Sequence, residues 1–381
     1  MKPIEKLQLP LEVTEEDQKR YLQLVSTDLS GEQIERLLTP PEIYPNQKSV
    51  LAVHWHPEFV PLDLIMRRVA ATFPNREEEL IIPTQHNRLT SLNGFSGVEV
   101  DCYSQQFNRK VQLLLHFKEE DVEGEKAPIL KEMLNYTFKY RNQQLFEFID
   151  TIIDEKYRHR LEFPAKKTGS DLNLVNFVKI HATKLKKLLE QNESITRPEM
   201  VRNKLIRDYF ALQNDGSHPD LIERAQIFLR EVKQIVKANF SLTYFYRTSE
   251  IIEEAKSLNA GIVIPHPEQF WPILLADYDV DGYEVWNPQS QEYTEFLINV
   301  VDRQNKSGKG RNKPILIFMG DDTHFGEKVL DPKDQNQEKA KREIGVHPAW
   351  EDRDIRKSLI IAGASRKKVI NEYKNRLLNS Y

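Results

Sequence analysis

The segment that decides the fold reads Ser49-Val50-Leu51-Ala52-Val53-His54-Trp55-His56. Its first five residues are mostly apolar and β-branched, which is typical of a short strand buried on both faces. Two histidines follow where this strand ends. Because side chains i and i+2 of an extended segment point to the same side, both imidazoles can face one ion or two neighbouring ions. The segment therefore predicts a buried strand that carries two metal-binding side chains at its C-terminal end.

Six further apolar runs share this composition. They cover residues 80–82, 97–100, 111–115, 261–264, 283–286 and 314–318. Helical patterns lie between several of them, such as the one at 248–257. Strands that alternate with helices favour an α/β fold with a parallel sheet, and a barrel is one form of that fold.

The strand signal stops between residues 119 and 240, and helical patterns replace it at 126–156, 171–191, 197–213 and 219–238. We therefore expect an N-terminal helical extension at 1–47, an α/β domain at 48–118 and 241–381, and a helical insertion at 119–240. The insertion begins just after a strand, so we expect it to form a cap over the strand ends. Residues 156–192 contain nine Lys/Arg and three Asp/Glu. This excess favours an anionic polymer or nucleotide as partner, and an ordinary solvated helix face explains it equally well.

Composition bounds the class of protein. The chain has 381 residues and a formal net charge of −4, with 39% hydrophobic and 29% charged residues, as in a globular protein. Cys102 is the only cysteine, which excludes an intramolecular disulfide and a thiolate metal cage. No apolar run approaches the roughly 20 residues of a membrane helix, and the first residues lack the apolar core of a signal peptide. We expect a cytoplasmic location.

Six of the ten histidines lie at or just past the end of an apolar run. They are His54, His56, His86, His116, His266 and His324. Carboxylates accompany them at Glu99, Asp321 and Asp322. Ligands of α/β folds bind beyond the C-terminal strand ends, and neutral imidazole with carboxylate suits zinc, manganese or iron. The other four histidines, His159, His181, His218 and His347, are expected on the surface or in helices.

Seven segments also follow one another in the order of a known family. They are His54-Trp55-His56, Pro83-Thr84-Gln85-His86-Asn87, Gly97-Val98-Glu99-Val100, His116, Ile264-Pro265-His266-Pro267, Gly282-Tyr283-Glu284-Val285-Trp286-Asn287 and Gly320-Asp321-Asp322-Thr323-His324. Together they resemble the motifs of the polymerase and histidinol phosphatase (PHP) family. The sequence differs from the family pattern in having Gln85 where an Asp is usual. It also lacks a third histidine after the first pair, where Asp63 is a candidate replacement.

The resemblance implies a distorted seven-stranded (β/α) barrel of PHP type and two or three divalent metal ions per chain. It implies as metal ligands His54, His56, His86, Glu99, His116, His266, Asp322 and His324. Such a site hydrolyses phosphate esters through a metal-bound hydroxide, because cations neutralise the phosphoryl oxygens and acidify bound water. Among these residues Glu99, Asp322 and His324 are the candidate catalytic groups, with Glu99 bridging two ions.

Three readings of the function stay open. The favoured one is hydrolysis of phosphodiesters in nucleic acid or nucleotides. The second is a small-molecule phosphomonoesterase similar to histidinol phosphatase. The third is a metal-binding PHP module without catalytic activity that serves as a scaffold. All three predict a bound metal, and only the first two predict turnover of a phosphorylated substrate.

Overall fold

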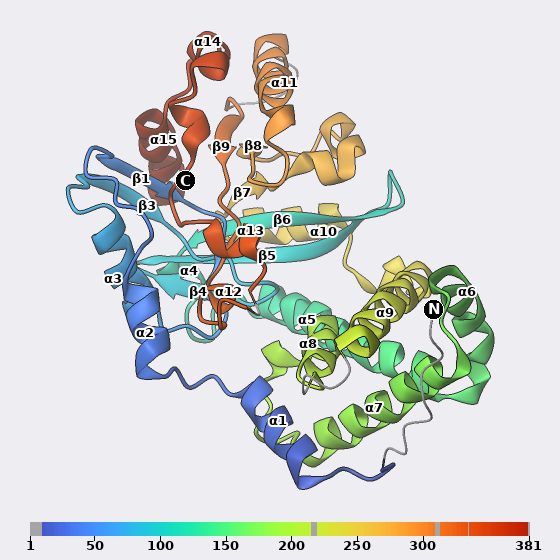
Figure 1. Cartoon of the computed structure of the whole chain (residues 1–381). Coiled ribbons are helices and arrows are strands. Elements are labelled where there is room, and N and C mark those ends of the chain that lie inside the picture. The colour runs from blue at the N-terminus through green and yellow to red at the C-terminus, as the bar shows by residue number, and fades with distance from the viewer. Residues whose placement is uncertain (1–9, 215–218, 309–312, 334, 380–381) are drawn as a thin grey trace. The chain divides into compact units, whose positions relative to one another are not determined.

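The computed structural model describes residues 10–214, 219–308, 313–333 and 335–379, and it divides into two compact units (Figure 1). A helical unit comprises residues 1–28 and 139–241, and an α/β unit comprises residues 29–138 and 242–381. The long helix α5 (Pro128–Ile153) contributes to both units. The predicted domain limits remain predictions. The described part of 119–240 contains helices and no strand, in agreement with its sequence pattern.

The helical unit is built from α1 (Glu15–Val25), the second half of α5, α6 (Arg158–Thr168), α7 (Leu172–Gln191), α8 (Asn203–Ala211) and α9 (Pro219–Asn239). Its core contains side chains from each of these helices, including Leu145, Leu185 and Phe228. Helix α1 starts at a capping box in which Thr14 and Asp17 satisfy each other's backbone amides. In the described part of the chain no helix is long and apolar enough to cross a membrane.

The basic segment of α7 is neutralised within the helical unit. The ammonium groups of Lys184, Lys186 and Lys187 lie 2.7, 2.8 and 2.9 Å from carboxylate oxygens. Lys184 is only 3% exposed and is paired with Asp17. These three lysines therefore anchor neighbouring helices, which favours the solvated or structural interpretation of the charge excess over a site for an anionic polymer.

The α/β unit contains one mixed sheet of six strands in the order β4-β5-β6-β7-β8-β9. The strands are β4 (Thr90–Leu92), β5 (Phe95–Ser104), β6 (Arg109–Lys118), β7 (Gly261–Ile264), β8 (Gly282–Trp286) and β9 (Leu316–Met319). The first four pair antiparallel, and β7, β8 and β9 pair parallel. Figure 1 shows the last three side by side.

Two parallel pairs stand beside this sheet. They are β1 (Ser49–Ala52) with β3 (Glu78–Ile81), and β2 (Trp55–His56) with β10 (Thr323–His324). The expected α/β class is therefore present, but the expected seven-stranded barrel is not shown, because the sheets are small and mixed. The expected parallel arrangement is wrong for β5 and β6, which form a hairpin of two ten-residue strands.

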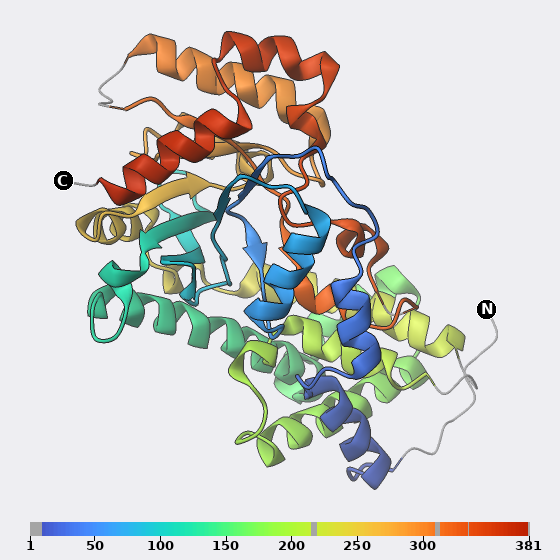
Figure 2. The same cartoon turned by 90° about the vertical axis from the view of Figure 1, so that its left-hand side faces the viewer.

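Helices surround these strands in the α/β unit. They include α2 (Gly31–Leu38), α3 (Leu62–Thr72), α4 (Glu119–Val122), α10 (Thr248–Ser257), α11 (Thr294–Ser307), α14 (Arg353–Ile361) and α15 (Arg366–Leu378). Short helices α12 (Phe325–Lys328) and α13 (Gln337–Lys341) follow β10. Helix α15, red in Figure 2, contacts β1, β3, β6 and β9. Two apolar clusters fill the unit, one around β5–β9 and one around β1 and α3.

The direction of β6 removes the argument for a cap. His116 near the end of β6 pairs with Gly261 at the start of β7, since the two strands are antiparallel. Strand β6 therefore ends beside the start of β7, whereas His266 follows the other end of β7. The helical insertion leaves the sheet beside the start of β7, so its position in the sequence gives no reason to expect it over the candidate site.

Candidate metal centre

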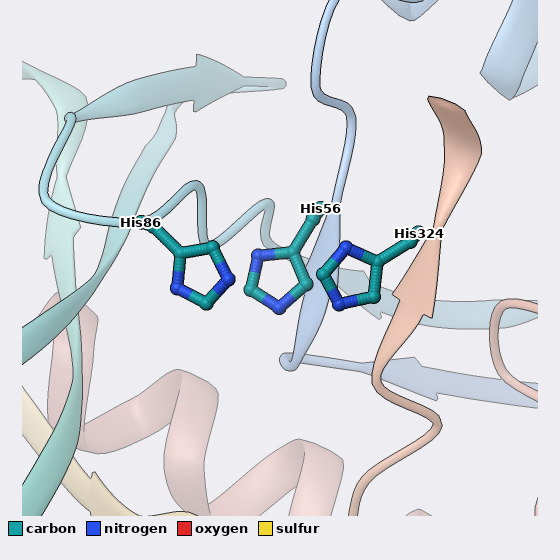
Figure 3. A group of neighbouring side chains, drawn as sticks. All are labelled: His56, His86 and His324. Atoms are coloured by element: carbon teal, nitrogen blue, oxygen red, sulfur yellow. The ribbon is translucent and has the colours of Figure 1, made fainter. Parts of the chain in front are cut away.

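The side chains that the sequence singled out mostly converge in the α/β unit. The parallel pair β2–β10 brings His56 opposite His324, and an isolated bridge joins His86 to Glu99. Figure 3 shows the rings of His86, His56 and His324 in one row, although each comes from a different segment of the chain. His56 stacks on each neighbour with ring centroids 4.3 Å apart.

Three groups of side chains have the geometry to hold a divalent ion. They are His56, His86 and His324; His54, His56 and Asp322; and His54, Glu99 and His266. Within each group the potential ligand atoms lie within 4.8 Å of one another. His56 belongs to two groups and so does His54, which makes the three groups one continuous centre. Seven of the eight predicted ligands are members.

Two carboxylates lie among the imidazoles. Glu99 is 1% exposed, and its oxygens lie 3.6 Å from His56 Nε2 and 3.9 Å from His266 Nε2, with a closer contact to His86. Burial raises the pKa of Glu99, but the imidazoles of His86 and His56 lower it well below its usual range. Glu99 is thus an anion that reaches two of the groups.

Asp322 is the second of these carboxylates. Its Oδ1 lies 3.4 Å from His56 Nε2 and 3.3 Å from His324 Nε2. Its Oδ2 accepts hydrogen bonds from Arg342 Nη1 at 2.6 Å and from Gln289 Nε2 at 2.8 Å. Burial raises the pKa of Asp322, but the imidazoles of His324, His56 and His54 lower it well below its usual range. One oxygen is therefore fixed by outer partners, and the other faces the histidines.

Glu284 at β8 positions two further members of the centre. Its Oε1 accepts from His54 Nδ1 at 2.7 Å, and its Oε2 accepts from the backbone N–H of His266 at 2.9 Å. Burial lowers the pKa of His54, but this carboxylate outweighs it and raises that pKa to about 10. The bond at Nδ1 leaves Nε2 of His54 for the centre. A Cβ atom at Gly320 would lie 1.7 Å from Glu284 Oε1, so only glycine leaves room for this carboxylate.

His116 is a correction to the predicted ligand set. Both of its ring nitrogens have protein partners: Nδ1 is 2.7 Å from the Tyr373 hydroxyl and Nε2 is 2.9 Å from the Val53 carbonyl. Burial lowers its pKa to about 3, so the ring is neutral, donating from Nε2 and accepting at Nδ1. The antiparallel course of β6 accounts for this position. We therefore remove His116 from the candidate ligands.

Glu58 joins the centre although the sequence analysis did not select it. Its Oε1 lies 3.4 Å from His324 Nδ1, and its side chain is 7% exposed. Its backbone N–H donates to Gln85 Oε1 at 3.1 Å, which gives the departure from the family pattern at Gln85 a structural role. Asp63, the predicted replacement ligand, is exposed in the first turn of α3 and belongs to none of the groups found in the described residues.

The four histidines that were not predicted as ligands differ in position and burial. His159 is exposed in α6, and His181 is buried in α7, both as expected for helix residues. His218 lies outside the described residues. His347 was expected on the surface or in a helix; it directly precedes a short 3-10 helix (Pro348–Trp350) and is 1% exposed, with Nε2 3.4 Å from Asp321 Oδ2. Asp321 also accepts backbone N–H bonds from residues 323 and 345, so it fixes the loop and does not belong to the metal groups.

The chemistry of this donor set fits divalent ions. His54 Nε2, His266 Nδ1 and both ring nitrogens of His56 are buried and lack a hydrogen-bond partner of normal geometry among the described residues. Burial and the imidazoles of His86 and His324 lower the pKa of His56 to about 3, which keeps it in the neutral form that binds metals. Such nitrogens are costly to bury unless a ligand satisfies them. Imidazole with carboxylate suits zinc, manganese or iron.

Comparisons with known proteins add little to this geometry. No protein-family model matches the sequence, and no curated protein matches it. Among solved structures, a proposed metal-dependent phosphoesterase from Bifidobacterium adolescentis is similar to this chain at 15% sequence identity and a TM-score of 0.39. The similarity covers 83% of this chain and 97% of the other. Likeness at this level does not support an argument, so the inference about function rests on the site itself.

Proposed function

We propose that this chain is a metal-dependent phosphoesterase whose centre is formed by His54, His56, His86, Glu99, His266, Asp322 and His324. One observation carries the proposal. The three ligand groups share His54 and His56, and ring nitrogens of these two histidines are buried without a hydrogen-bond partner among the described residues. Groups that share members favour two or three ions close together. Closely spaced ions neutralise the oxygens of a phosphate ester and activate water for attack on phosphorus.

The protein side chains have distinct proposed roles. Glu99 would contribute its carboxylate to the ions held by two of the groups, because its oxygens lie near the imidazoles of His56 and His266. Asp322 presents one oxygen to the centre while Arg342 and Gln289 hold the other. His324 is proposed as a metal ligand through one ring nitrogen, with Glu58 Oε1 3.4 Å from its Nδ1. It serves as the proton donor to the leaving group only where no ion occupies its ring, a state in which Asp322 and Glu58 raise its pKa against the effect of burial.

The substrate is proposed only as a phosphate ester. The preference for nucleic acid or nucleotides rested on the basic segment 156–192 and on a cap above the site. Three of those lysines are paired within the helical unit, and the direction of β6 removes the argument for the cap. Diesters and small monoesters therefore enter the test on equal terms.

The test measures turnover by the full chain. Protein stripped with a chelator and reloaded with zinc or manganese is assayed on p-nitrophenyl phosphate and on bis(p-nitrophenyl) phosphate. The expected result is metal-dependent hydrolysis of at least one ester, lost in His56→Asn and retained in His159→Asn, which changes an exposed histidine of α6. Bound metal without turnover of either ester would contradict the proposal and favour the scaffold interpretation.

A further inference from the structure

A cavity of about 780 Å³ lies in the α/β unit, and none of the metal-centre residues lines it. It is bordered by residues 43–49, which lead into β1, and by residues 350–367 around α14 and the start of α15. Since His54 and His56 follow the C-terminal end of β1, the cavity and the metal centre lie at opposite ends of that strand. Its volume is within the range of sites for small organic molecules.

The cavity has a basic lining. Lys48, Arg356, Arg366 and Lys367 line it, against one acidic residue, Glu351. Lys48 and Lys367 also contact exposed or half-exposed carboxylates outside the lining, whereas Arg356 is exposed and has no partner in the described ranges. Apolar and aromatic side chains, including Tyr44, Trp350 and Leu359, complete the walls.

Arg366 is the unusual member of this lining. Its side chain is 10% exposed, and its one ion pair among the described residues is a 3.4 Å contact to Glu351, which is itself 77% exposed. Its Nε is buried and has no hydrogen-bond partner among the described residues, and the same holds for Trp350 Nε1. Neither buried nitrogen is open to the cavity, so a ligand there would meet the outer nitrogens of the guanidinium, and the long contact to Glu351 leaves these with capacity for further hydrogen bonds.

The start of α15 adds further donors. Arg366 and Lys367 are its first two residues, and the cap Ser365 accepts only from the amide of Lys368 among them. The amides of a helix's first turn have no acceptor within the helix and favour anions, phosphate above all. Helix α15 is 13 residues long, so its N-terminal field is developed.

We propose that this cavity binds an organic phosphate, with the phosphate on Arg366 and the start of α15 and the apolar or aromatic part against Trp350. A planar guanidinium beside a helix N-terminus matches the several oxygens of one phosphate. The indole of Trp350 lines the cavity and offers an apolar surface for the organic part of the ligand. This ligand site is separate from the metal centre and does not depend on hydrolysis there.

Isothermal titration calorimetry with phenylphosphonate tests the proposal on the full chain. This probe combines a ring with a phosphonate whose phosphorus–carbon bond a phosphoesterase does not hydrolyse. The expected result is a saturable site that persists after divalent metal is removed with a chelator, with inorganic phosphate and benzyl alcohol each binding at least about 10-fold more weakly there, because each supplies only half of the contacts. Absence of saturable binding to the wild type would overturn the proposal.

Variants locate the site. Arg366→Gln should weaken binding at least about 10-fold and Arg356→Gln about 3-fold, while Lys357→Gln, an equal charge change on α14 outside the lining, leaves it unchanged. Asp322→Asn should bind as the wild type does. Loss of binding in Asp322→Asn with retention in Arg366→Gln would assign the anion to the metal centre and refute the proposal. If Arg366→Gln does not fold, unchanged binding in Arg356→Gln refutes it.

Discussion

Glu284→Gln isolates the orienting role of one buried carboxylate. Glu284 accepts two hydrogen bonds, from His54 Nδ1 at 2.7 Å and from the backbone N–H of His266 at 2.9 Å. A glutamine has one acceptor and one donor group at these positions. The backbone N–H of His266 is always a donor, so the glutamine oxygen must face it. The glutamine NH₂ then faces His54 Nδ1, which must become an acceptor.

In the neutral form of His54, which is the form that binds metal, that change places the proton on Nε2, the nitrogen that lies 3.7 Å from Asp322 Oδ1 within the centre. A protonated Nε2 cannot ligate a metal. Loss of an outer partner that sets a histidine tautomer typically weakens metal binding by about 10–100-fold, which is about 1.4–2.7 kcal/mol. We expect Glu284→Gln to fall in this range although no proposed ligand is removed.

The assay is a competition titration of zinc or manganese against a chromophoric chelator, with circular dichroism melting as the folding control. Glu292→Gln is the matched variant, since it removes the same charge from an exposed residue six positions from the end of β8. Equal metal affinity in folded Glu284→Gln and in the wild type would refute the tautomer argument.

Three further predictions use the same protein. Asp322→Asn keeps an acceptor for Arg342 and should lower hydrolysis by at least about 100-fold with little change in melting temperature, and a steady-state assay beside a melting curve checks this. His116→Asn should lower the free energy of unfolding by about 1–3 kcal/mol in urea and leave metal affinity unchanged, since the ring is bonded only to the protein; a large loss of affinity would restore it as a ligand. Burial raises the pKa of Glu343, but Lys328 and Arg68 outweigh that effect and lower it below the usual 4.5. The ionised Glu343 therefore contributes fully to the free energy of unfolding above about pH 4.5, and this contribution is lost as the pH falls through the lower pKa of the folded state. Glu343→Gln should cost about 3 kcal/mol at pH 7 and less at pH 3, and the opposite trend in urea melts would contradict this.

The strands were predictable from composition, and their directions were not inferred correctly. Each of the seven apolar runs overlaps a strand, because buried strands require such side chains. Only four residues, 105–108, connect β5 to β6, and a parallel crossover needs about a dozen. This short connection was visible in the sequence and would have predicted the hairpin. It would also have separated His116 from the other strand-end histidines.

The candidate site was predictable where a ligand lies close behind an apolar strand. His54, His266 and Asp322 come two or three residues after the ends of β1, β7 and β9, and His56 and His324 lie in the short strands that follow β1 and β9. The supporting residues gave weaker signals, because their partners are distant in sequence. Arg342 reaches Asp322 from a segment without an apolar pattern, and no spacing rule predicts that contact.

Of the two acidic residues that the sequence analysis did not select, Glu284 could have been found from the sequence and Glu58 could not. Glu284 is an acidic residue in the middle of an otherwise uncharged strand, β8. Such a carboxylate is expected to be buried and to need hydrogen-bond partners. Glu58 follows the first histidine pair by two residues and takes a positive φ of 54°, a local conformation that sequence patterns do not predict. Gly326 leaves room for it, since a Cβ there would lie 2.1 Å from Glu58 Oε2.

The number of divalent ions per chain tests the central claim most directly. Full-length protein is equilibrated with micromolar zinc or manganese, freed of excess metal and measured by elemental analysis beside His56→Asn and the exposed control His159→Asn. The shared ligand groups predict two or three ions in the wild type and the control, and at least one fewer in His56→Asn. A wild-type chain without bound ion, or an equal count in folded His56→Asn, would contradict the proposed metal centre.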